Sequence, residues 1–318
     1  MKTQRTSPLK RGFTLMELMV AMAITTIIVT VLVSITSIAL DTWNRSRSEL
    51  RASRQAKSMI DTMARDFESL VTRRGNTGEW LSAVTDPDLG KIGDKMVSTN
   101  ASKLIFFTAA TDRYDGQIGT STDLGGDVSC VAYQLEYKDP IDPTGTTKFE
   151  TFVLSRLLVS PKDTFDKLLG NTDSTNTAKS LDTVFATAYA TQLSDPKNFV
   201  CENVFQFSVT FHVQVTDATK TPSVFDVPVT VGKTPSGQMT DSFRIQGTGI
   251  KAEINGGSVT TAQLASGRVT AIEISATVLS DFGVDQSKSR TFKDAEAKAT
   301  FFGKNSYQYS KLIQLPSM

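Results

Sequence analysis

The chain has 318 residues, of which 39% are hydrophobic and 8% aromatic, so it can form a packed core and is not expected to be disordered. Its formal net charge of +1 gives no electrostatic reason to expect nucleic acid as a partner. The single histidine, His212, argues against histidine-based catalysis and against a metal site built from several histidines.

A long apolar segment lies near the N-terminus. From Leu18 to Leu40 there is no charged residue, proline or glycine, and about 20 helical residues suffice to cross a hydrocarbon core of about 30 Å. Neither glycine nor proline occurs between Phe13 and Arg74, and after residue 40 apolar residues recur at three- and four-residue steps or their sums. We therefore predict one continuous helix, a transmembrane helix over residues 13–40 with an amphipathic continuation over residues 41–72. The apolar stripe of the continuation consists of Trp43, Leu50, Ala56, Ile60, Met63, Phe67 and Leu70.

Two ordinary interpretations compete for this segment. A secretory signal peptide would explain the basic residues of positions 2–11 and a small-residue site ending at Ala39, but its apolar region should be about 7–15 residues long and free of acids. A plain single-span anchor explains the length and leaves Glu17 unexplained, because a carboxylate at mid-membrane costs about 2.5–3.5 kcal/mol. That cost is smaller near the end of the span, so the anchor stays open as an alternative.

The stretch KRGFTLMEL resembles the cleavage and methylation signal of type IV pilins and type II secretion pseudopilins. In that family a short basic leader ends in glycine, phenylalanine usually follows, and a glutamate stands at the fifth mature position; Gly12, Phe13 and Glu17 occupy these places. The resemblance implies a leader peptide over residues 1–12, cleavage after Gly12 by prepilin peptidase, and methylation of the new amine of Phe13. It also implies an assembly role for Glu17, since a carboxylate in an apolar bundle is tolerated when a cation, here the Phe13 amine of a neighbouring subunit, pairs with it.

The resemblance also bears on topology. Many major pilins have a proline at the place of Ser34, so no proline kink is expected here. Basic residues flank the span on both sides, and the positive-inside rule therefore does not orient it. A cytoplasmic N-terminus before processing, a single span of the bacterial inner membrane and a periplasmic or extracellular C-terminal domain are what the resemblance implies.

The remainder of the chain, residues 73–318, has a different texture. Residues 74–95 contain glycines and a proline and are interpreted as a loop. Residues 160–198 are rich in Ser, Thr, Asn and Asp and predict a loop insertion, and residues 302–318 give no clear signal. Six other segments alternate apolar with polar residues and are rich in β-branched and aromatic side chains, as strands are: residues 103–109, 130–137, 148–159, 204–215, 225–231 and 268–279.

These elements predict an α+β fold, in which the long N-terminal transmembrane helix packs against a β-rich, antiparallel C-terminal domain. In residues 205–215 the apolar side chains all fall on one face, which suits a sheet with that face against the helix. The pseudopilin resemblance implies the same order of elements. The segments MIDTMARDFESL, VAYQLEYK, LSRLLV, VFQFSVTF and VTAIEISATVLSD are similar in order to minor pseudopilin J of type II secretion, and similar patterns occur in Verru_Chthon cassette prepilin-like proteins.

Few residues suggest chemistry. His212 lies on the polar side of its predicted strand, no Gly-x-Ser-x-Gly motif occurs, and GTGIKA (residues 247–252) lacks the βαβ context of a dinucleotide site and is interpreted as a turn. Calcium is a further hypothesis, although the acids do not have EF-hand spacing and Asp with Gly is ordinary turn chemistry. The acids in question are Asp112, Asp115, Asp123 and Asp127.

The two cysteines, Cys130 and Cys201, allow one disulfide in an oxidising compartment. Cys201 shares parity with the apolar face that contains Phe207, whereas Cys130 falls on the polar side of its own strand. Opposite faces would prevent a bridge, unless Cys130 lies just outside its strand. The sequence leaves the pairing open.

The sequence thus predicts a non-enzymatic, prepilin-like structural subunit of a type II secretion pseudopilus or related type IV filament, without a cofactor. Its expected partners are prepilin peptidase, other pilin-like or pseudopilin subunits and inner-membrane lipid, with no nucleic acid. The alternative is a single-span, membrane-anchored extracytoplasmic binding module.

Overall fold

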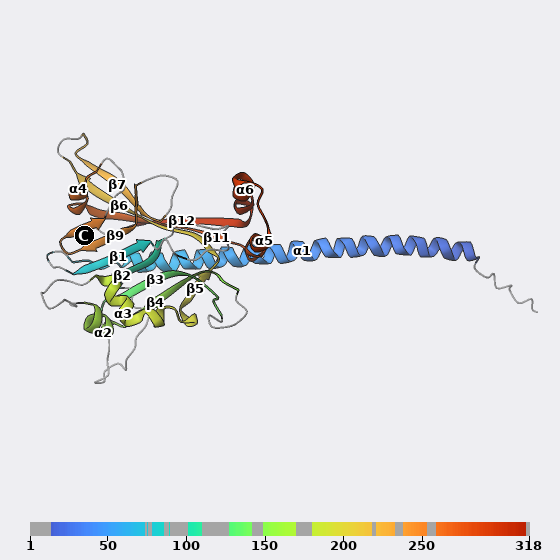
Figure 1. Cartoon of the computed structure of the whole chain (residues 1–318), viewed down its shortest axis with the longest axis horizontal. Coiled ribbons are helices and arrows are strands. Elements are labelled where there is room, and N and C mark those ends of the chain that lie inside the picture. Colours follow the sequence, from blue (N-terminus) through green and yellow to red (C-terminus); the bar gives the residue numbers. More distant parts are fainter. Residues whose placement is uncertain are drawn as a thin grey trace, which may run out of the picture. The chain divides into compact units, whose positions relative to one another are not determined.

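Helix α1 (Leu15–Glu68) is a single unbroken helix, as the absence of glycine and proline predicts (Figure 1). The chain divides into two compact units, Met1–Ser48 and Glu49–Met318, and α1 contributes residues to both. The structure is a computed structural model, and it describes residues 14–73, 75, 78–85, 89, 101–109, 127–141, 149–169, 180–217, 221–232, 238–252 and 259–315.

The second unit contains two β-sheets, which confirms the predicted α+β class. The seven-stranded sheet has the order β10-β9-β1-β2-β3-β4-β5, and all its neighbours are antiparallel. Its strands are β1 (Glu79–Thr85), β2 (Ala101–Thr108), β3 (Ser129–Lys138), β4 (Thr151–Leu158), β5 (Phe199–Glu202), β9 (Ser242–Gln246) and β10 (Gly249–Ala252).

The five-stranded sheet has the order β12-β11-β6-β7-β8. Its neighbours are antiparallel except β7 and β8, which are parallel. Its strands are β6 (Val204–Thr216), β7 (Val224–Val231), β8 (Gln238–Thr240), β11 (Arg268–Leu279) and β12 (Ser306–Gln314). Along the chain, α4 (Thr261–Ala265) precedes β11, and α5 (Asp281–Ser289) and α6 (Ala295–Asn305) lie between β11 and β12.

A single residue, Asn203, links β5 of the seven-stranded sheet to β6 of the five-stranded one. Its φ is 60°, in the left-handed region that asparagine adopts more readily than most residues. The side chain holds this turn from both sides, because Asn203 Oδ1 accepts a hydrogen bond from Thr151 Oγ1 at 2.6 Å and Nδ2 donates to Asp281 Oδ1 at 2.8 Å. One continuous stretch of apolar sequence can therefore supply neighbouring strands to both sheets.

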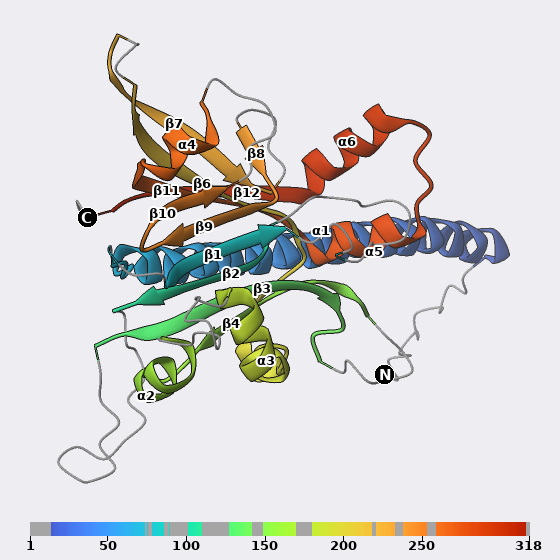
Figure 2. The same cartoon turned by 60° about the vertical axis from the view of Figure 1, so that its left-hand side comes forward.

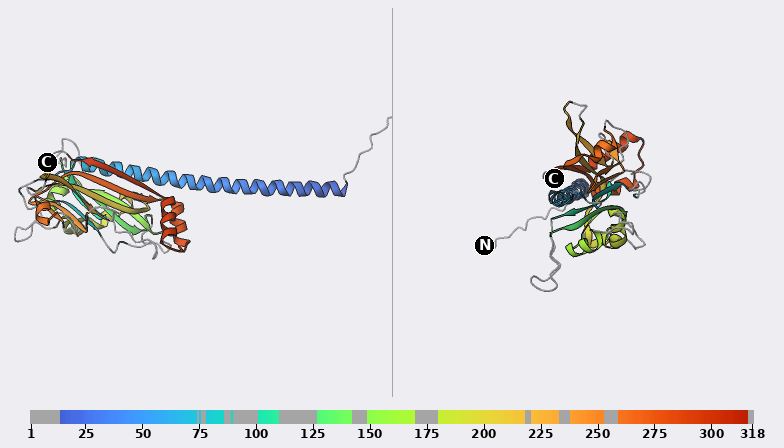
Figure 3. Two further views of the ribbon diagram at one scale, coloured as in Figure 1. Left: turned by 90° about the horizontal axis from the view of Figure 1, so that it is seen from above. Right: turned by 90° about the vertical axis from the view of Figure 1, so that its left-hand side faces the viewer.

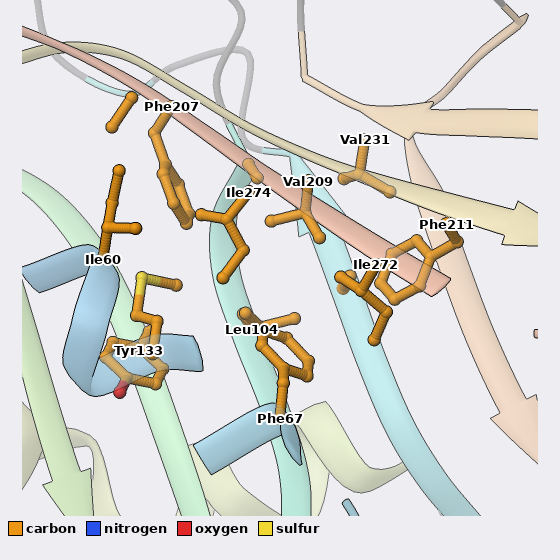
Figure 4. Close-up of a cluster of buried hydrophobic side chains, with 14 of the residues drawn as sticks. Ile60, Phe67, Leu104, Tyr133, Phe207, Val209, Phe211, Val231, Ile272 and Ile274 are labelled. Atoms are coloured by element: carbon orange, nitrogen blue, oxygen red, sulfur yellow. The ribbon is translucent and has the colours of Figure 1, made fainter. Parts of the chain in front are cut away.

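The main hydrophobic core lies between the two sheets and the part of α1 in the second unit. The right-hand view of Figure 3 looks along α1 and shows strands of both sheets beside the helix. Phe67 of α1 stacks on Phe106 of β2 with ring centroids 4.2 Å apart, and Phe211 of β6 stacks on Phe243 of β9 at 4.0 Å. Figure 4 shows Phe67 and Phe211 in this core together with Tyr133 of β3 and with Ile272 and Ile274 of β11. The apolar face predicted for residues 205–215 is buried here, except that Phe205 is only partly buried.

The other face of the seven-stranded sheet has a second hydrophobic cluster, which the sequence did not predict. In the segment interpreted as a loop insertion, residues 160–198, the structure contains α2 (Pro161–Asp163), a π-helical turn (Thr164–Leu168), a 3-10 turn (Pro196–Asn198) and the longer helix α3 (Leu181–Leu193). Apolar residues of α3, including Phe185, Tyr189 and Leu193, are buried in this cluster with Phe107 of β2 and Cys130 of β3. Figure 2 shows α3 against β4 on this side.

Six strands coincide within a few residues with the predicted segments: β2, β3, β4, β6, β7 and β11. Other strands arise where the sequence showed no strand pattern. Strand β1 lies inside the predicted loop 74–95, and β12 inside the segment without a clear signal. Strand β1 is hydrogen-bonded on both sides, to β2 and to β9, and this pairing comes from residues distant in the sequence.

Candidate assembly segment and helix clamp

The apolar part of α1 has the surface of a membrane-spanning helix. It is long and apolar enough to cross a membrane, and no side chain in its most apolar window is buried in the structure. Its threonine hydroxyls need no external partner, because each donates to a backbone carbonyl four residues earlier. These hydroxyls belong to Thr25, Thr26, Thr30, Thr36 and Thr42, with distances of 2.6–2.8 Å.

Glu17 and Thr14 form a capping box at the start of α1. The backbone N–H and the hydroxyl of Thr14 donate to Glu17 Oε2 at 2.9 and 3.0 Å, and the N–H of Glu17 donates to Thr14 Oγ1 at 3.2 Å. Such reciprocal bonds satisfy backbone donors that a helix leaves free at its first turn. Glu17 therefore has a local role in the single chain, in addition to the assembly role predicted for it. Gly12 and Phe13, the predicted processing site, lie outside the described residues.

The apolar stripe predicted for residues 41–72 is buried only in part. Ala56, Ile60, Met63, Phe67 and Leu70 belong to the main core. By contrast, Trp43 is 69% exposed and Leu50 is 55% exposed. An exposed tryptophan just beyond an apolar span is typical of residues at a membrane–water interface.

A buried ion cluster binds the C-terminal turn of α1 to the seven-stranded sheet. Asp66 of α1 accepts two hydrogen bonds from Arg156 of β4, from Nε to Oδ2 at 2.8 Å and from Nη2 to Oδ1 at 2.9 Å. Tyr133 of β3 donates its hydroxyl to the same Oδ2 at 2.5 Å. Tyr133 and Arg156 are directly opposite each other in the β3–β4 pair. The backbone carbonyl of Asp66 also accepts from Thr108 Oγ1 of β2 at 2.8 Å. We call Asp66, Tyr133 and Arg156 the helix clamp.

The side chains of the helix clamp are almost fully buried. The side chain of Asp66 is 3% exposed and that of Arg156 is 12% exposed. Burial raises the pKa of Tyr133 well above its usual range, the Asp66 charge raises it further, and Arg156 opposes the shift. Tyr133 thus remains a neutral hydrogen-bond donor. A bidentate arginine–carboxylate pair with its remaining acceptor satisfied is the geometry in which a buried ion pair offsets its desolvation.

The sequence showed the parts of the helix clamp without showing their contact. The acid, the tyrosine and the arginine lie in MIDTMARDFESL, VAYQLEYK and LSRLLV, three of the segments noted in the sequence for their order. A further signal is Asp66 itself, an acid directly beside Phe67 in the stripe that faces the core. An acid on a buried helical face requires a cation from elsewhere in the fold.

The two cysteines are both free and buried, so the disulfide left open by the sequence does not form. Cys201 lies in the main core and Cys130 in the second cluster, on opposite faces of the seven-stranded sheet, as their parity predicts. The face of Cys130 is nevertheless not polar, because α3 covers it. Burial raises the pKa of the Cys201 thiol to about 12 and that of Cys130 further.

Those of the remaining candidates that the structure describes form no assembled chemical site. His212 Nε2 is 4.0 Å from Glu273 Oε2, and its side chain is 27% exposed on the polar face of β6. Asp127 is exposed, while Asp112, Asp115 and Asp123 lie outside the described residues. Within the described part of the chain, no three His, Cys, Asp or Glu side chains are grouped so as to hold a metal ion. The turn predicted at GTGIKA is confined to residues 247–248, and residues 249–252 form β10.

Comparison with known families agrees with the N-terminal geometry. The family model of the prokaryotic N-terminal methylation motif matches residues 8–33, which include Gly12, Phe13 and Glu17. This match supports a type IV pilin-like prepilin, and the apolar helix is consistent with membrane anchoring. No curated protein and no solved structure matches the chain.

Proposed function

We propose that this chain is a structural, non-enzymatic subunit of a type II secretion pseudopilus or a related type IV filament. Prepilin peptidase cleaves after Gly12 and methylates the amine of Phe13, and the apolar helix then bundles with those of other pilin-like subunits. The β-rich domain presents its surface on the periplasmic or extracellular side of the inner membrane. The methylation motif at residues 8–33 is the observation that carries this proposal.

Glu17 supplies the contact between subunits in this proposal. Its carboxylate stands in an apolar segment whose described neighbours offer it only the N–H and hydroxyl of Thr14. Both are uncharged donors, so no cation is paired with this carboxylate among the residues that the structure describes. Cleavage creates a cation on Phe13, and pairing it with the Glu17 of a neighbouring subunit neutralises both charges away from water.

The capping box provides a sharp test of this role. Glu17→Gln removes the charge and keeps an amide oxygen that accepts from Thr14, as glutamine does in capping boxes. Glu17→Ala removes both features, and Thr14→Ala removes the cap while leaving the charge. We expect both Glu17 variants to insert into the membrane and to fail in co-assembly, whereas Thr14→Ala co-assembles. Crosslinking to other prepilin-like chains measures this, and normal incorporation of Glu17→Gln would refute the charge-pairing role.

Processing separates the proposal from its alternative, a membrane-anchored binding module. Intact-mass measurement of the protein extracted from membranes should show a chain that begins at Phe13 and carries one methyl group. A chain that still begins at Met1 would favour the simple anchor. Cleavage after Ala39 would favour a secretory signal peptide.

A further inference from the structure

A pocket of about 200 Å³ opens at one end of the second unit, where three segments meet. It is lined by the residues that follow α1, by the β9–β10 hairpin and by the link between α4 and β11. Figure 2 shows β9, β10 and α4 close together in this part of the fold. Arg73 and Arg268 both line the pocket, and no aspartate or glutamate is among its described lining residues.

The walls of the pocket are held by close backbone contacts. Gly249 has a φ of +132°, and a Cβ at this position would lie 2.2 Å from the carbonyl oxygen of Ala265. Gly267 is similarly close to Val213, where a Cβ would lie 2.6 Å from Cγ1. Helix α4 is in turn fixed by a capping box between Thr260 and Gln263. Glycine is therefore required where the hairpin meets α4, and this close approach fixes one wall of the pocket.

Arg268 leaves a hydrogen-bond donor unused in this region. Its Nε is buried and has no hydrogen-bond partner among the described residues. A buried donor without an acceptor is costly, and native proteins normally supply it with one. A guanidinium group matches the geometry of a carboxylate or phosphate, to which it donates two parallel hydrogen bonds.

We propose that this pocket binds a small oxyanion, a carboxylate or phosphate group, between Arg268 and Arg73. Arg268 and Arg73 supply the two positive charges of the lining, and Arg73 is the exposed one. The site is independent of Glu17 and of filament assembly, so each proposal stands or fails without the other. A free anion and the terminal carboxylate of a peptide share this chemistry.

Calorimetric titration of the full chain in a neutral detergent at constant ionic strength tests the proposal. The probes are inorganic phosphate, citrate, and a short peptide with either a free C-terminal carboxylate or a C-terminal amide. We expect saturable binding of at least one oxyanion probe. Arg268→Gln and Arg73→Gln should each weaken it by about tenfold or more, since a charge-assisted hydrogen bond is lost.

Arg65→Gln is the matched control, because Arg65 is an exposed arginine of α1 that does not line the pocket. This variant should leave the affinity unchanged. Binding of the free peptide but not its amide would identify a chain terminus as the source of the anion, and binding of phosphate or citrate would identify a free anion. Absence of saturable binding by every probe, or equal affinity in Arg268→Gln, Arg73→Gln and the control, would overturn the proposal. Because Arg73 is exposed, its variant remains informative even if Arg268→Gln does not fold.

Discussion

Removal of Arg156 should strongly destabilise the β-rich domain. In Arg156→Met the carboxylate of Asp66 stays buried, with its side chain 3% exposed in the native protein, and loses both hydrogen bonds from the guanidinium. Breaking a buried ion pair from one side costs about 3–5 kcal/mol, because the remaining charge is uncompensated. Tyr133→Phe removes a single hydrogen bond to a charged group and should cost about 1.5–3 kcal/mol.

Removing both charges should cost much less than the sum of the two single changes. In Asp66→Leu/Arg156→Met no buried charge is left, and replacing a buried pair by apolar side chains is often neutral or stabilising by about 1–4 kcal/mol. The hydroxyl of Tyr133 then lacks its acceptor, which returns a cost of about 1–3 kcal/mol. Adding Tyr133→Phe to the double variant should recover that cost. The coupling between residues 66 and 156 is therefore expected to be large and favourable.

Urea unfolding of the full chain in detergent measures these differences, with tryptophan fluorescence as the signal. Trp80 of β1 is buried and reports the β-rich domain, and Trp43→Phe removes the exposed second tryptophan from the background. A cost below about 1 kcal/mol for Arg156→Met would place the helix clamp in the range of a solvated surface ion pair. Strictly additive costs in the double variant would likewise refute the argument.

Two further predictions concern the thiols and a glycine. Because the pKa of Cys201 is raised to about 12 and that of Cys130 further, an unfolded chain loses thiol protons above pH ~8.5 while the folded one keeps them. The free energy of unfolding should therefore fall above that pH, by about 1.4 kcal/mol per pH unit and cysteine; Cys130→Ala/Cys201→Ala should have a shallower dependence, and an unchanged slope would contradict this. Alkylation of either thiol should require unfolding, and rapid labelling of the native protein would disprove their burial. Gly249→Ala should destabilise by at least about 1–3 kcal/mol, since φ is +132° and the new Cβ meets Ala265; a melting temperature equal to that of the unchanged chain would refute this.

Local patterns were sufficient for the elements whose signal lies within their own residues. The unbroken helix follows from a run without glycine or proline, and the alternation in residues 204–215 gives both β6 and its buried face. The same is true of the methylation motif, which depends on the spacing of Gly12, Phe13 and Glu17. In each case the physical cause is periodic or local, so distant residues are not needed to recognise it.

The elements that sequence patterns did not predict form through pairing and packing with residues that are distant in the sequence. Strand β1 has glycine-rich flanks and becomes a strand because β2 and β9 supply hydrogen bonds on both of its sides. The apolar stripe of α3 is short and lies between polar segments. Its burial can be recognised only when the face of β2 and β3 that it covers is known. The alternation of residues along the strands predicted that the two cysteines lie on opposite faces. The face that carries Cys130 is buried only because α3 covers it.

By itself, the sequence determined an apolar N-terminal helix with an N-terminal methylation motif, followed by a domain of strands, because these properties depend on residue spacing and periodicity. The tertiary structure alone decided that the chain forms two sheets around one helix. It also decided that Asp66 meets Tyr133 and Arg156, and that two arginines line one pocket. Such contacts join residues far apart in the chain, and their energy comes from burial and charge pairing that exist only once the sheets have assembled.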